Sequence, residues 1–138
     1  MFGFSKDELK LLRSLRTPRA VQDFLDTIPI NFEEHGETLL SPRKVLLERK
    51  AHCMEGALLA AAAFWVQGRK PLLVQLRTTR RDVDHVIAIF FERGRYGAVS
   101  KTNHAVLRWR EPLYKSVREL VMSYFHEYFL DNGRRTLR

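Results

Sequence analysis

The only cysteine of the chain, Cys53, lies at the predicted start of a helix that runs to Gln67. A thiol in that position faces unpaired backbone N–H groups and the positive end of the helix dipole, and both favour the nucleophilic thiolate. Such a nucleophile needs a proton acceptor from elsewhere in the chain. The best placed acceptor is His85, which opens a predicted strand, because His52 flanks the cysteine and has little freedom to turn back on it. Cys53 and His85 are therefore a candidate nucleophile and its candidate base.

A bland interpretation of Cys53 competes with this one. Unpaired cysteines are among the most frequently buried residues, and most of them behave as small, inert hydrophobic side chains. The order of elements favours chemistry, because a helix-starting cysteine is followed by a strand-starting histidine and then by a strand that ends in polar residues. The remaining histidines fall on predicted loops or on the last helix: His35, His104 and His126.

The elements that must position this pair begin with three short helices. Each has a side-chain cap, and two of them carry proline at the first helical position, where its missing N–H costs nothing. The signals are the capping box of Ser5 and Glu8, the pair Thr17 and Pro18, and the pair Ser41 and Pro42. The helix from Cys53 to Gln67 is apolar around nearly its whole circumference, so we expect it, including Trp65, to be buried.

From Pro71 onward the hydrophobic period changes to two, which predicts three short antiparallel strands. They are PLLVQLRT (71–78), HVIAIFF (85–91) and RYGAVSK (95–101), and the second is apolar on both faces, as expected for a central strand under a helical layer. A last helix starts at the capping box of Ser116 and Glu119. The predicted fold is α+β: an antiparallel sheet of at least three strands packed against a buried central helix, with an N-terminal helical part and a C-terminal helix. We expect residues 1–138 to form a single domain.

Two segments of the chain together resemble the core of the transglutaminase-like superfamily. In that family a proline, a short helix, a basic residue and a cysteine precede an alanine-rich helix, which ends at a glycine and leads into a strand. The first segment of this chain is similar to that order: SPRKVLLERKAHCMEGALLAAAAFWVQGRKPLLVQL. The second segment resembles the family's histidine-bearing strand and the strand that follows it: DHVIAIFFERGRYGAVSKTN. The resemblance covers roughly residues 30–103 and implies a papain-related Cys, His, Asp arrangement that transfers acyl groups from amides. A peptidase, amidase, deamidase or transglutaminase is implied, with Cys53 and His85 in the family positions.

The third position departs from the family pattern, because Ser100 stands where the family has aspartate. A serine can orient an imidazole but cannot stabilise an imidazolium by charge. Hairpin register offers an alternative: a four-residue turn places Ser100 opposite His85, whereas a three-residue turn with Gly94 left-handed puts Asn103 on the His85 face. Ser100 and Asn103 both remain candidates for the orienting residue.

An oxyanion hole would consist of the Cys53 backbone N–H and a second donor from the loop at residues 30–36. Asn31 is the only side-chain amide in that loop, although a turn-forming role suits it equally well. Glu55, in the first turn of the central helix, is favoured there by the helix dipole, so we prefer a structural role for it.

Charged side chains crowd the loop that enters the histidine strand. Arg77, Arg80 and Arg81 would flank the site and favour an anionic substrate, although a solvated charge run is the commoner explanation. Asp82 and Asp84 follow them directly, and aspartates at strand entries are mostly solvated turn residues.

Composition bounds the remaining alternatives. The net charge is +8, and the excess is concentrated in residues 70–138, which carry 14 basic and 7 acidic side chains. Such a surplus suits a nucleic-acid partner or simply a soluble surface, and no nucleic-acid motif accompanies it. The chain has no apolar run long enough for a membrane span, no signal peptide and no paired cysteines, which favours the cytoplasm. The sequence indicates no cofactor and no metal site.

Three functional hypotheses follow. The first is a cysteine-dependent enzyme that acts on a peptide or protein amide. The second is a catalytically silent transglutaminase-like domain that binds a protein or nucleic acid. The third, with less support, is a basic nucleic-acid-binding protein, whose affinity would depend steeply on salt concentration.

Overall fold

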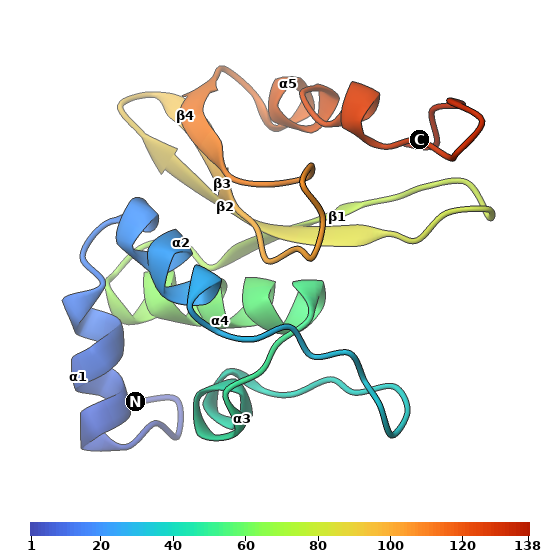
Figure 1. Cartoon of the computed structure of the whole chain (residues 1–138). Coiled ribbons are helices and arrows are strands. Elements are labelled where there is room, and N and C mark those ends of the chain that lie inside the picture. The colour runs from blue at the N-terminus through green and yellow to red at the C-terminus, as the bar shows by residue number, and fades with distance from the viewer.

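The computed structural model describes residues 1–138 and is α+β, as predicted (Figure 1). Five α-helices, four strands and one 3₁₀ turn follow one another along the chain. The first half holds α1 (Lys6–Ser14), α2 (Pro18–Asp26), α3 (Pro42–Glu48) and α4 (Cys53–Val66). The second half holds β1 (Leu72–Leu76), β2 (His85–Glu92), β3 (Arg95–Val99), β4 (Arg110–Tyr114), α5 (Val117–Met122) and η1 (Phe125–Glu127).

The predicted cap signals start the helices where expected. The Ser5 hydroxyl accepts a hydrogen bond from the Glu8 N–H, and the Glu8 carboxylate accepts one from the Ser5 N–H, which completes the capping box of α1. Thr17 and Ser41 cap α2 and α3, each of which begins at a proline. Local chemistry therefore fixes the starts of all three helices.

Helix α4 is central and largely buried, but the prediction that Trp65 belongs to the core was wrong. Its side chain is 52% exposed and stacks on Phe2 of the N-terminal segment, with ring centroids 4.1 Å apart. The reason is geometric: α4 packs against the sheet on one side and helices α1, α2 and α3 on others, which leaves one stripe uncovered. The alanines of α4 face the core, where Ala57, Ala60 and Ala63 are buried.

The sheet is antiparallel with the order β1-β2-β3-β4, so the predicted meander of three strands is extended by a fourth. Strand β4 has the sequence REPLY, and the sequence pattern does not predict a strand there because Pro112 lies in its middle. Proline is tolerated there because β4 is an edge strand, and its pairing with β3 is irregular between Tyr96 and Ala98.

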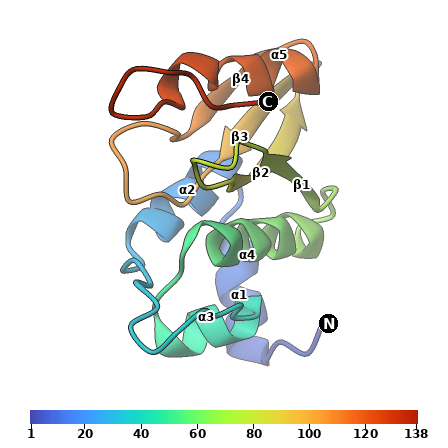
Figure 2. The ribbon, with the colours of Figure 1, turned by 90° about the vertical axis from the view of Figure 1, so that its right-hand side faces the viewer.

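Strand β2 is central and separates two layers of core, as its two apolar faces predicted. On one face Ala88 and Phe90 pack with α4 and the N-terminal helices. On the other face Ile87 and Ile89 pack with α5 and the segment after it. Figures 1 and 2 show the sheet between these layers, with α4 on one side and α5 on the other.

The C-terminal helix starts where predicted, at Ser116, whose hydroxyl accepts from the Glu119 N–H. It ends at Met122, and a 3₁₀ turn continues the chain. The apolar stripe nevertheless remains in register, because Leu120, Tyr124 and Tyr128 are all buried on the β2 side.

Candidate active site

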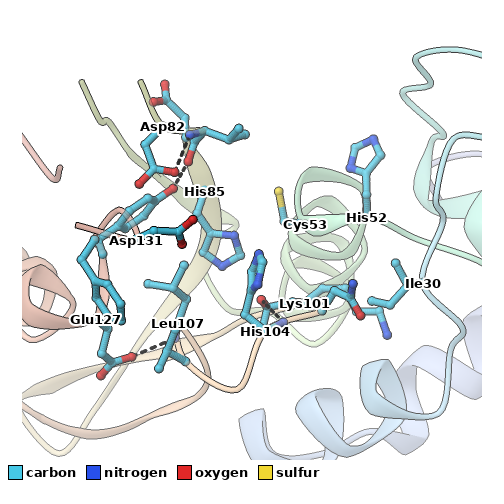
Figure 3. Close-up of a pocket in the computed structure, with 17 residues that line it drawn as sticks. Ile30, His52, Cys53, Asp82, His85, Lys101, His104, Leu107, Glu127 and Asp131 are labelled. Carbon is cyan, nitrogen blue, oxygen red and sulfur yellow. Dashed lines mark hydrogen bonds between the residues drawn. The ribbon is translucent and has the colours of Figure 1, made fainter. Parts of the chain in front are cut away.

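One pocket of about 570 Å³ lies at the end of the sheet where the two layers meet. Five parts of the chain line it: Ile30 after α2, the start of α4, the entry to β2, the loop from Lys101 to Leu107, and the segment around η1 (Figure 3). Cys53 and His85 both line this pocket, so the fold brings the two candidate residues into one cavity although they are distant in sequence.

Cys53 is the first residue of α4 and is partly exposed. No backbone hydrogen bond of the chain uses the N–H of Cys53 or of Met54, as expected for the first residues of a helix. These donors, the helix dipole and the thiol therefore lie at one helix end. That arrangement suits both thiolate formation and the stabilisation of a developing oxyanion.

His52 caps the helix and does not act on the thiol. Its Nδ1 accepts from the Glu55 N–H at 3.4 Å, and its Nε2 lies 2.9 Å from the Thr38 carbonyl, to which it donates. Both ring nitrogens are thereby used in holding the start of α4. In Figure 3 the His52 ring lies on one side of Cys53, and the rings of His85 and His104 lie on the other.

The His85 ring is held by Ser100. The Ser100 hydroxyl donates to the Leu107 carbonyl at 2.6 Å, so it must accept from His85 Nε2–H, which lies 2.7 Å away. This assigns the proton to Nε2 and leaves Nδ1 as a bare acceptor with no hydrogen-bond partner in the chain. A neutral imidazole with a free acceptor nitrogen is the form that a general base requires.

Burial keeps that imidazole neutral. The His85 side chain is 5% exposed, and desolvation, with a smaller contribution from nearby His104, lowers the pKa of His85 to about 4. The Leu107 carbonyl works in the opposite direction without compensating. No carboxylate contacts the ring, so the serine orients it without stabilising its charged form.

The hairpin between β2 and β3 differs from both turns considered above. Glu92 pairs with Arg95, so the turn has two residues, Arg93 and Gly94, both at positive φ. This is the turn type whose twist matches that of the flanking strands. Its register sets Ser100 diagonally across from His85 rather than directly opposite, yet the two side chains share a face and bond.

Asn103 does not orient His85, contrary to the second alternative. It is exposed on the loop after β3, lines the rim of the pocket and forms no hydrogen bond to the ring. The three-residue turn that would have placed it on the ring does not form.

A residue that the sequence analysis overlooked, Gln22 of α2, fixes the position of Ser100. Its Nε2 donates to the Ser100 carbonyl at 2.9 Å, and its Oε1 accepts from the Ser100 N–H at 2.8 Å. Gln22 is itself buried. The only available signal was a polar residue beside the apolar stripe of a helix, which is too common to single out.

No hydrogen bond joins the Cys53 thiol to the His85 ring, so the contact expected of a formed triad is absent. Strand alternation explains this: His85 shares its face with Ile87 and Ile89, which is the face covered by α5 and not the face covered by α4. The exposed His104, which the sequence analysis set aside as a loop histidine, also lines the cavity, and Figure 3 shows its ring near that of His85.

Asn31 cannot serve as the predicted oxyanion donor. Its Nδ2 donates to Glu55 Oε1 at 2.9 Å and to Thr38 Oγ1 at 2.8 Å, so both of its N–H bonds are used. It is buried and does not line the pocket that holds Cys53. The physical reason is the demand of Glu55, whose 0% exposed carboxylate must be satisfied by hydrogen bonds.

Glu55 has the structural role that we preferred for it. Besides Asn31, it accepts from the Thr38 hydroxyl at 2.8 Å, the Leu40 N–H at 2.6 Å and the His52 N–H at 3.0 Å. Burial works to raise the pKa of Glu55, but these bonds outweigh it and hold the pKa below its ordinary value. A charged carboxylate thereby ties the loop before α3 to the start of α4.

The three arginines do not reach the pocket. Arg77, Arg80 and Arg81 are exposed on the loop between β1 and β2, and none of them lines the cavity. The aspartates that follow them, Asp82 and Asp84, line it instead. The expectation of an anionic substrate therefore loses the residues on which it depended.

Lys101 lies against the start of α4, but its ammonium group is bound to backbone carbonyls. Its Nζ donates to the carbonyls of Leu25 and Ile28, which closes the end of α2. Its side chain also lies against Gly56, where an added Cβ would meet Lys101 Cβ at 2.3 Å. Gly56 is thus the residue that lets the chain after β3 pass close to α4.

No set of three or more histidine, cysteine or acidic side chains is arranged to hold a metal ion. None of the helices is long and apolar enough to span a membrane. The chain matches no protein-family model, and no curated protein is significantly similar to it in sequence.

Proposed function

We propose that the chain is a cysteine-dependent acyl-transfer enzyme of transglutaminase-like type that acts on an amide bond. The observation that carries the proposal is the protonation state of His85: Ser100 takes the Nε2 proton into a hydrogen bond and leaves Nδ1 free in the cavity that also holds Cys53. A structural histidine would have both nitrogens satisfied, as His52 does.

The reaction follows from these groups. His85 Nδ1 takes the thiol proton, and the Cys53 sulfur attacks the amide carbonyl carbon. The carbonyl oxygen becomes an oxyanion at the start of α4, where the N–H groups of Cys53 and Met54 are unpaired. The C–N bond then breaks, the amine leaves with the proton from His85, and a thioester remains. Water or a second amine attacks the thioester, which releases the acyl group and restores the thiol.

For this reaction the Cys53 side chain must approach His85 by a rotamer change or a small shift of the loop from Lys101 to Leu107. Catalytic hydrogen bonds are often long in empty sites and tighten when a ligand excludes water. The cavity of about 570 Å³ leaves room for such a movement.

Acylation by p-nitrophenyl acetate tests the proposal without knowledge of the natural substrate. We expect a burst of nitrophenolate equal to one acetyl group per chain, located on Cys53 by mass spectrometry and absent in Cys53→Ala. The acetyl group should then be lost more slowly in His85→Gln than in the native protein, since the base also activates the attacking water. Acetylation spread over surface lysines with no burst would contradict the proposal.

A second candidate, a catalytically silent domain of the same type that binds a protein or nucleic acid, is favoured by two observations. No hydrogen bond links Cys53 to His85, and the third position holds Ser100 in place of a carboxylate. This hypothesis predicts an unreactive thiol in the same experiment.

A further inference from the structure

We propose that the pocket accepts a substrate with a basic side chain, lysine or arginine, close to the amide that Cys53 attacks. The assignment of a substrate rests on the proposed function, whereas the preference for a cation is a property of the cavity that is measured separately.

The charge of the lining is opposite to that of the protein. The chain has 24 Lys and Arg residues and a net charge of +8, yet no arginine lines the pocket. Its one lysine, Lys101, is bound to carbonyls at the end of α2. Four carboxylates line the same cavity: Asp82, Asp84, Glu127 and Asp131. In Figure 3 the labelled carboxylates, Asp82, Glu127 and Asp131, lie on the side of His85 away from α4.

Three of these carboxylates form no ion pair within the chain, although the charge of Arg77 makes a small contribution to lowering the pKa of Asp84. Glu127 pairs with Arg110, but Asp82, Asp84 and Asp131 form no ion pair with any residue of the chain. Asp84 accepts from the Thr78 N–H and hydroxyl and from Gln75, which lowers the pKa of Asp84 and keeps it charged. These donors fix the Asp84 carboxylate without neutralising it.

Apolar surface beside the carboxylates suits the stem of a long basic side chain. Val83 is 78% exposed and Phe129 is 50% exposed, and both line the pocket. Lysine and arginine bury their methylene stems on such surface while the charged head reaches polar groups. The Phe129 ring already carries the Arg135 guanidinium, 5.5 Å from its centroid, so one of its faces tolerates a cation.

Tyr128 lines the cavity together with the aspartates, Cys53 and His85. The phenol of Tyr128 donates to the Val83 carbonyl within the loop that carries Asp82 and Asp84. Burial first, and then the charges of Asp82, Asp84 and Cys53, raise the pKa of Tyr128. Tyr128, the aspartates and Cys53 all line one cavity, so a single substrate can reach both the thiol and the carboxylates. His85 lies in the same cavity, where it is 5% exposed and its Nδ1 has no hydrogen-bond partner in the chain.

Charged thiol reagents of similar size test the preference directly. Cationic 2-(trimethylammonium)ethyl and anionic 2-sulfonatoethyl methanethiosulfonate both form a disulfide with the thiolate and expel methanesulfinate. The rate constants for Cys53 are divided by those for 2-mercaptoethanol, and we expect the cationic reagent to be favoured by about tenfold, within the range for charged clefts. The net charge of +8 alone would favour the anionic reagent. A cationic-to-anionic ratio above one therefore reports the local electrostatic field of the pocket, and a ratio below one reports the net charge of the protein.

Matched variants locate the origin of the ratio. We expect it to fall to one or below in Asp82→Asn/Asp131→Asn, and to be unchanged in Asp7→Asn/Glu34→Gln, which removes two exposed acidic groups outside this pocket. Because Asp82 also bonds Thr136, Asp131→Asn alone, at an exposed side chain with no bond in the chain, serves as a second test, and about a threefold fall is expected.

Failure of this inference and failure of the proposed function give different results. A preference of Cys53 for the anionic reagent, or a ratio unaffected by the Asp82 and Asp131 variants, would overturn the cation subsite. A slow reaction with neutral iodoacetamide would instead contradict the catalytic proposal, and a cation preference retained in that case would support the subsite alone.

Discussion

The carboxamide of Gln22 holds both backbone groups of Ser100, with its Nε2 2.9 Å from the Ser100 carbonyl and its Oε1 2.8 Å from the Ser100 N–H. Ser100 in turn fixes the tautomer of His85 through its hydroxyl. A helix near the N-terminus thereby sets the orientation of a histidine on the central strand.

Replacing Gln22 by leucine should leave the buried N–H and carbonyl of Ser100 unpaired. We expect the free energy of unfolding to fall by about 2 to 6 kcal/mol, since each of the two buried unsatisfied groups costs about 1 to 3 kcal/mol. Urea denaturation measures the change. The matched control is Glu37→Leu, at an exposed side chain that forms no hydrogen bond or ion pair in the chain, where a change within about 0.5 kcal/mol is expected. Equal effects of the two substitutions would show that Gln22 does not anchor Ser100.

The buried His85 should make stability depend on pH. Its pKa of about 4 lies below the ordinary value of 6.5, so between these values the unfolded chain binds more protons than the folded one. The free energy of unfolding should therefore keep its full value above pH 6.5, where His85 is neutral in both states, and should fall by about 3 kcal/mol as the pH drops to 4. Chemical denaturation across this range, with His85→Gln as the non-titrating comparison, measures the effect. Parallel pH profiles for the two proteins would exclude it.

Glu55→Gln should destabilise the start of α4. The carboxylate accepts from four groups of the chain, and an amide would direct its own N–H bonds at some of these donors. We expect a loss of about 3 kcal/mol in the free energy of unfolding, in the range for a broken buried charge network. Differential scanning calorimetry would detect it, and an unchanged melting temperature would mean that the network contributes nothing net.

Gly56→Ala should also be poorly tolerated, although alanine is the better helix former. The new Cβ would meet Lys101 Cβ at 2.3 Å, so the chain after β3 must move. Overpacking of this kind costs about 1 to 3 kcal/mol, which exceeds the gain of about 1 kcal/mol from helix propensity. A more stable variant by urea denaturation would show that this chain segment yields freely.

Much of the fold could be predicted from local chemistry. The caps at Ser5, Thr17 and Ser41 mark helix starts by short-range hydrogen bonds, and the two apolar faces of β2 mark a central strand. What failed depends on contacts distant in sequence. Trp65 is exposed because no helix covers its side of α4, and β4 escaped notice because only its edge position allows Pro112.

The candidate site divides in the same way. The positions of Cys53 and His85 in one cavity agree with expectation, because helix start and strand start follow from local pattern. The bond from His85 to Ser100 was one of two alternatives, and it forms across a two-residue turn that neither alternative contained. The role of Gln22 was missed, since it depends on a partner far along the chain, Ser100. For Asn31 the turn-forming alternative is the one that the structure supports, because its Oδ1 accepts from the Glu33 N–H at 3.0 Å, whereas its bond to Glu55 was not foreseen. Arg77, Arg80 and Arg81 were expected to flank the site but do not line the pocket, because the direction of their loop is set by tertiary packing.

The central claim is that His85 activates Cys53, and the rate of alkylation of Cys53 by iodoacetamide at pH 7 tests it most directly. We expect the folded protein to react at least about tenfold faster than a model thiol, and His85→Gln and Ser100→Ala each to lose most of that advantage, in line with the contribution of a positioned base. Circular dichroism confirms that the variants are folded. A native Cys53 that reacts no faster than the model thiol, or variants that react as fast as the native protein, would contradict the account.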